Sequence, residues 1–93
     1  MNKFDILKVL ADKKELYHLK NFILFGSVAQ DTNKSDSDID IAYIEDEIKL
    51  NFENYLKLES ELTDIFQKKI DLVNYKKFNP LVILHAKDSF IYV

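Results

Sequence analysis

The sequence has 93 residues, of which 47% are apolar and 13% aromatic, which is enough for one small domain with a packed core. A single glycine, a single proline and no cysteine disfavour disorder and a turn-rich all-β fold, and they exclude disulfides and thiolate metal sites. Thirteen basic and sixteen acidic residues give a net charge of −3, which disfavours a nonspecific nucleic-acid binder.

The first predicted elements are a helix and a buried strand. Apolar residues fall near helical spacing over residues 2–19, and the run at 21–25 predicts a strand. The lysines of this stretch are interpreted as a solvated surface: Lys3, Lys8, Lys13, Lys14 and Lys20. A short helix is expected to begin at Val28, and the turn-forming residues 31–37 predict a loop.

The second half of the chain is predicted to alternate strands and helices: a strand over 38–44, a helix from about 48 or 51 to 68, a strand over 69–75, a helix from 79 or 80 to about 87, and a short strand over 89–93. Asn51 and Asn79 fit helix N-caps, and Pro80 fits the first helical position. The aromatic stripe of the longer helix is interpreted as core, and the charged residues 45–47 as a solvated strand exit. This order predicts an α/β (α+β) domain, a small mixed sheet with helices packed mainly on one face.

The connection after the first predicted strand contains candidate phosphate-binding residues. Gly26, the only glycine, follows the first strand and stands next to Ser27. A glycine used once is expected where the backbone needs a free φ and where another group approaches it closely. Backbone N–H groups and the Ser27 hydroxyl at such a turn can bind an anion, which favours a phosphate ligand.

Three aspartates are candidate metal ligands. Asp38 and Asp40 are two residues apart at the start of a predicted strand, so their side chains are expected on one face. Carboxylates this close repel and raise each other's pKa, which a protein tolerates when a cation lies between them. Asp71 lies between Ile70 and Leu72 and is costly to bury without a partner. Oxygen ligands suit Mg²⁺, and a metal beside a phosphate site suggests a nucleoside triphosphate.

This pattern resembles a known family. Gly-Ser, ten intervening residues, Asp-x-Asp and a later aspartate in a strand resemble the signature of the DNA polymerase beta-like nucleotidyltransferases. Within them the short chain is similar to the minimal nucleotidyltransferase (MNT) group, many of whose members are antitoxins encoded beside a HEPN-domain toxin. The resemblance covers roughly residues 22–93.

The resemblance implies a site and an activity. Gly26 and Ser27 would hold the triphosphate of ATP, and Asp38, Asp40 and Asp71 would hold two Mg²⁺ ions and carry catalysis. The protein would be a Mg²⁺-dependent nucleotidyltransferase that transfers AMP to a hydroxyl, expected to be a tyrosine, of a HEPN ribonuclease toxin and neutralises it.

Three alternatives stay open. Family members often carry a basic residue and a glycine where this chain has Gln30 and Asp31, which leaves room for a binding-only antitoxin with a weakened site. A small-molecule nucleotidyltransferase subunit would need an acceptor domain from a partner chain. The third alternative is a plain α/β domain whose aspartates bind a structural cation.

The location of the protein is predicted from the absence of two signals. No apolar run approaches the roughly 20 residues that span a membrane, and the first residues lack the apolar region of a signal peptide. We therefore expect residues 1–93 to form a single cytoplasmic domain with no membrane association and no direct nucleic-acid partner.

Overall fold

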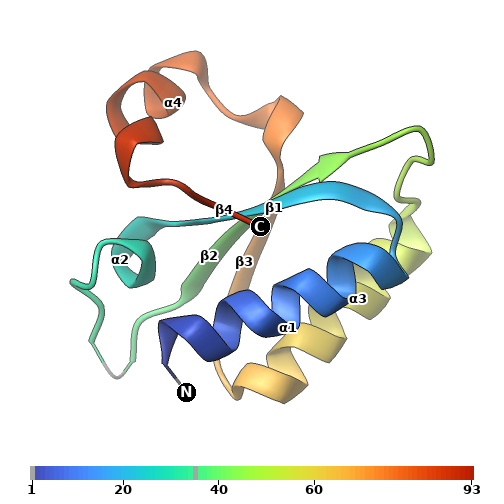
Figure 1. The fold of residues 1–93 in the computed structure, drawn as a ribbon, viewed down its shortest axis with the longest axis horizontal. Coiled ribbons are helices and arrows are strands. Elements are labelled where there is room, and N and C mark those ends of the chain that lie inside the picture. Colours follow the sequence, from blue (N-terminus) through green and yellow to red (C-terminus); the bar gives the residue numbers. More distant parts are fainter. Residues whose placement is uncertain (1, 35) are drawn as a thin grey trace.

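A mixed four-stranded sheet forms the centre of the computed structural model, which describes residues 2–34 and 36–93 (Figure 1). Its strands are β1 (Leu19–Phe25), β2 (Ile39–Glu45), β3 (Ile70–Asn74) and β4 (Ile91–Tyr92), in the order β3-β2-β1-β4. β1 runs antiparallel to β2 and β4, whereas β3 runs parallel to β2. Parallel neighbours need a long crossover, and the helix between them supplies it.

Two long helices cover one face of the sheet. Figure 1 shows α1 (Lys3–Leu16) and α3 (Phe52–Phe66) lying side by side, with the strands between them and α4 (Pro80–Ala86). Buried positions recur at helical spacing, namely Ile6 and Leu10 on α1, and Leu58, Leu62 and Phe66 on α3. The predicted small mixed sheet with helices mainly on one face is therefore confirmed.

The opposite face carries a smaller aromatic cluster. Ile23, Ala42 and Phe90 are buried there, and the ring of Phe25 packs edge-on against Phe78 with 5.1 Å between centroids. α4 closes over this cluster through Ala86. The sheet face opposite α1 and α3, which was expected to carry few helices, is thus partly covered by α4.

Helix ends follow the predicted caps. The Asn51 side chain accepts a hydrogen bond from the Asn54 N–H, and the Asn79 side chain accepts one from the Leu81 N–H. The predicted first helix was too long, because the chain leaves α1 at Tyr17 and His18 adopts a left-handed φ of 56°. A left-handed residue cannot continue the helix, so β1 begins at Leu19.

Two interpretations of surface and core were wrong in part, since Lys8 and Lys20 are exposed and Leu58, Leu62 and Phe66 are buried as expected. Lys3 and Lys13 form ion pairs with Asp31 and Glu61 rather than lying free in solvent. On α3, Phe52 is 74% exposed, so part of its aromatic stripe faces solvent.

No helix of the described residues is long and apolar enough to cross a membrane.

A hydrogen-bonded carboxylate joins the two long helices. Glu61 of α3 accepts a hydrogen bond from the Tyr17 hydroxyl at 2.6 Å and one from Lys13 Nζ at 3.2 Å. The Tyr17 hydrogen bond, with help from Lys13, lowers the pKa of Glu61, while burial and then Glu61 itself raise the pKa of Tyr17. We therefore expect the packing of α1 on α3 to depend on pH.

We expect Tyr17→Phe to lower the free energy of unfolding by about 1–2 kcal/mol at pH 7, because it removes a hydrogen bond to a charged group. A carboxyl group with a lowered folded-state pKa stabilises the fold above its ordinary pKa, and this contribution is lost as pH falls through the folded-state value. The difference between variant and wild type should therefore shrink below the ordinary glutamate value of 4.5. Urea denaturation at pH 7 and at acidic pH measures it. Tyr92→Phe, at a side chain that is 56% exposed, is the control. An equal difference at both pH values would contradict the charge dependence.

Candidate functional site

The predicted site residues meet where β1 ends and where β2 and β3 begin. Phe25 pairs with Asp40 across the antiparallel ladder, and Asp40 pairs with Asp71 across the parallel one. Directly paired residues point to the same face of a sheet. The carboxylates of Asp40 and Asp71 therefore lie side by side, on the face that carries the aromatic cluster.

Gly26 is required by its position against Asp40. It follows β1, begins the short helix α2 (Gly26–Ala29) and has a left-handed φ of 73°. A Cβ atom built on it would collide with the Asp40 carboxylate and lie 2.9 Å from its Cγ. The missing side chain therefore lets the carboxylate lie against the backbone of the turn, as the sequence predicted.

The surroundings of Asp40 oppose its ionisation. Burial, followed by the charges of Asp71 and Asp38, raises the pKa of Asp40. Ionising a half-buried carboxylate beside another acid costs free energy, and a divalent ion between the two would remove that cost. The oxygen donors of Asp40 and Asp71 are the ligand type that Mg²⁺ prefers.

Asp38 lies at the edge of this arrangement. β2 begins at Ile39 rather than at Asp38, whose side chain is 47% exposed and whose Oδ2 lies 4.0 Å from Lys69 Nζ. Within residues 2–34 and 36–93, no three acidic or histidine side chains are grouped so that they could hold a metal ion. Mg²⁺ commonly binds one or two carboxylates and completes its shell with substrate phosphates and water, so the Asp40–Asp71 pair still fits the ion.

Lys69 was not predicted as part of the site. It precedes β3 as Asp38 precedes β2, so the parallel register, which pairs Ile39 with Ile70, brings the two residues opposite each other. In the sequence, Asp38 and Lys69 each stand one residue before a strand. This shared position predicts their contact only once the register of the two strands is known.

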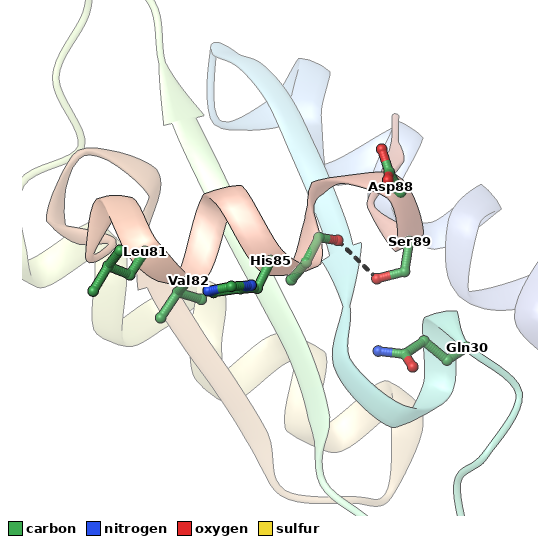
Figure 2. Close-up of a pocket in the computed structure, with 7 residues that line it drawn as sticks. Gln30, Leu81, Val82, His85, Asp88 and Ser89 are labelled. Atoms are coloured by element: carbon green, nitrogen blue, oxygen red, sulfur yellow. Dashed lines mark hydrogen bonds between the residues drawn. The ribbon is translucent and has the colours of Figure 1, made fainter.

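A pocket of about 500 Å³ lies near the other end of α2 (Figure 2). It is lined by Gln30 and by residues of α4 and the turn after it, namely Leu81, Val82, His85, Ala86, Asp88 and Ser89. The predicted metal ligands are not among its lining residues. Leu81 is 62% exposed and Leu84 is 61% exposed, so α4 presents apolar side chains to solvent.

Comparison with protein families agrees with this geometry. Residues 4–92 match the family described as "Polymerase beta, Nucleotidyltransferase". The chain belongs to this nucleotidyltransferase family. The nucleotidyltransferase is 39% identical over 88 residues to "Putative protein adenylyltransferase MJ1379" of Methanocaldococcus jannaschii, and the match spans 92% of this chain and 85% of that protein.

Solved structures similar to this nucleotidyltransferase come from toxin–antitoxin pairs. A crystal structure of a toxin–antitoxin with AMP-PNP matches with a TM-score of 0.68 and 27% identity, over 92% of this chain and 69% of the other. A complex of tri-AMPylated Shewanella oneidensis HEPN toxin with MNT antitoxin matches with a TM-score of 0.67 over 99% of this chain and 71% of the other. At 19% identity, the second match shows the fold alone. The predicted resemblance to the polymerase beta-like nucleotidyltransferases is thus confirmed, and the 27%-identical structure is that of a toxin–antitoxin.

Proposed function

We propose that this nucleotidyltransferase is an antitoxin that transfers AMP from ATP to a tyrosine hydroxyl of a HEPN ribonuclease toxin and thereby neutralises it. The observation that carries the proposal is the pair of adjacent carboxylates, Asp40 and Asp71, held against the glycine turn at Gly26. Similarity to a protein named as an adenylyltransferase and to a toxin–antitoxin with AMP-PNP supports it.

Each site residue has a role in the proposed reaction. The Gly26–Ser27 turn would hold the triphosphate. Asp40 and Asp71, which are paired across the sheet, would hold the two Mg²⁺ ions, and Asp38 at the edge of that pair would be a further ligand. When bound, Mg²⁺ neutralises the triphosphate and stabilises the attacking and leaving oxygens. Asp71 is exposed, so its carboxylate can receive the proton of the acceptor hydroxyl. The oxygen of that hydroxyl forms a bond to the α-phosphorus, the bond from phosphorus to the β-phosphate oxygen breaks, and pyrophosphate leaves.

A protein acceptor suits the surface around the site. α4 packs on the same sheet face as the two carboxylates, and its exposed leucines are of the kind that occur at protein interfaces. We propose that the toxin supplies the surface that orients its own tyrosine, since transfer depends on holding the hydroxyl in line with the α-phosphorus.

A second candidate is an antitoxin that neutralises its toxin by binding alone. Gln30 at the end of α2 is uncharged, and the Asp31 carboxylate beside it is bound to Lys3. The family resemblance implies a basic side chain at position 30 that would help to bind phosphate, so the uncharged Gln30 supports a weaker site.

Intact-mass measurement of the toxin distinguishes these functions. We expect a cognate HEPN toxin, sought first in the product of the neighbouring gene, to gain one or more AMP units when it is incubated with this protein, ATP and Mg²⁺. Chelation of Mg²⁺, or replacement of ATP by α,β-methylene-ATP, whose α–β bridge resists cleavage, should abolish the gain. A tight but unmodified complex would support neutralisation by binding, and the absence of both would contradict the proposal.

A further inference from the structure

One lysine links the first helix to the end of the glycine-turn helix. Lys3 Nζ of α1 donates hydrogen bonds to the Ala29 carbonyl at 3.2 Å and to Asp31 Oδ2 at 2.9 Å. The Lys3 side chain is 25% exposed, although a lysine ordinarily extends into water. The contact joins residues that are 26 and 28 positions apart in the sequence.

The segment that Lys3 holds is short and ends in an unusual backbone conformation. Ala29 is the last residue of α2, so a cation at its carbonyl satisfies a terminal acceptor and suits the negative end of the helix. Asp31 adopts a left-handed φ of 59°, which costs energy for a residue with a side chain. The Asp31 side chain is itself 76% exposed, so the link to Lys3 depends chiefly on the hydrogen bond to the Ala29 carbonyl.

Other hydrogen bonds keep the segment together internally. The Gln30 N–H donates to the Gly26 carbonyl at 3.1 Å, and the Thr32 N–H donates to the Ser27 carbonyl at 2.9 Å. These bonds link the two ends of the segment, so we expect it to shift as one unit. Val28 and Ala29 bury one side of it in the core, and Lys3 ties its far end to α1.

A small shift of this unit would reach the nucleotide site. α2 has four residues and is therefore only about 6 Å long, so movement at Ala29 is transmitted to Gly26. The space between Gly26 and the Asp40 carboxylate is too small for a methyl group. The distance between the turn that holds phosphate and the acids that hold metal thus depends on where α2 is fixed.

We propose that Lys3 is a positioning residue that fixes the Gly26–Ser27 turn for nucleotide binding through its hydrogen bonds to Ala29 and Asp31. This inference rests on the proposed function of the site. Lys3 reaches the end of α2 opposite Gly26, so in this proposal it acts through the position of the turn.

Lys3→Met is the test, with Lys8→Met as the matched control because Lys8 lies on the same helix and is exposed. We expect Lys3→Met to weaken AMP-PNP binding in the presence of Mg²⁺ and to raise the KM for ATP by about tenfold, while kcat changes by less than about twofold, since lost binding of the turn raises KM. Lys3→Arg should restore both values, because arginine can donate to the same two oxygens. Asp31→Asn, which tolerates the left-handed backbone, should give an intermediate effect.

Amide hydrogen exchange of the nucleotide-free protein separates positioning from loss of stability. In Lys3→Met, we expect the Gln30 and Thr32 amides to exchange about tenfold faster while amides of β1 and β2 stay protected. Exchange or KM equal to that of Lys8→Met, or faster exchange throughout the sheet, would overturn the inference. If the wild type neither binds AMP-PNP nor transfers AMP, the proposed function fails and takes this inference with it. If the wild type binds AMP-PNP and Lys3→Met binds it just as tightly, the inference about Lys3 is refuted while the proposed function stands.

Discussion

Asp40→Asn is expected to lower AMP transfer by about a thousandfold, because it removes a charged group that neutralises the reacting phosphate site. The same substitution should stabilise the metal-free protein. Burial and the neighbouring Asp71 and Asp38 raise the pKa of Asp40 in the folded state. A carboxyl group of this kind makes the fold less stable as pH rises from its ordinary value of 3.8 through its folded-state value, and asparagine stays neutral throughout.

Thermal denaturation and intact-mass assays test both parts of this prediction. With chelator present, the midpoint of Asp40→Asn should exceed that of the wild type at pH 7 and approach it at pH 3. Added Mg²⁺ should raise the midpoint of the wild type more than that of the variant, because an ion that binds only the folded state stabilises it. Asp36→Asn, in the exposed loop before β2, should leave transfer and stability unchanged. Transfer by Asp40→Asn at the rate of the parent would show that the assigned metal site is wrong.

Gly26→Ala is expected to cost about 1–3 kcal/mol of stability, because its backbone has a positive φ that residues with a Cβ rarely adopt. It should also lower transfer by about a hundredfold, since the new methyl group displaces the Asp40 carboxylate from the turn.

The two causes can be separated with a second substitution. In an Asp40→Ala background the colliding carboxylate is gone, so Gly26→Ala should cost less stability there than in the wild type. Urea denaturation of the four proteins gives this difference. Gln30→Ala, at the end of the same helix with an ordinary φ of −89°, is the control and should unfold like the wild type. An equal cost in both backgrounds would mean that the close approach to Asp40 contributes nothing.

The core of the site was predictable because it depends on local patterns. Alternation along a strand places Asp40 and Asp71 on the face opposite Ile41 and Leu72, and the structure pairs the two acids directly. A lone glycine at the end of a strand indicated the close approach that the structure shows. The assigned roles of the site residues in metal binding and catalysis stay predictions.

Contacts between distant segments were not predictable from those patterns. Lys3 and Asp31 are 28 residues apart, and nothing in either local sequence indicates that they meet. Glu45 looked like part of a solvated charge cluster, yet it accepts hydrogen bonds from the Leu50 N–H at 2.7 Å and from the Asn74 side chain at 3.1 Å. Such bonds depend on how the loop before α3 returns to the sheet, which charge and periodicity do not specify.

The alignment of β3 with β2 makes the integrity of the fold and the assembly of the acidic pair a single event. Ile70 and Leu72 fill the larger core while Asp71 between them joins Asp40. A register shift of one residue would bury the Asp71 carboxylate in the apolar layer and expose Ile70 and Leu72. The fold would then bear both the cost of burying a charge and the loss of apolar contacts. A chain in which β3 pairs in the correct register therefore also assembles the acidic pair, and a chain in which it pairs out of register loses both the core contacts and the pair.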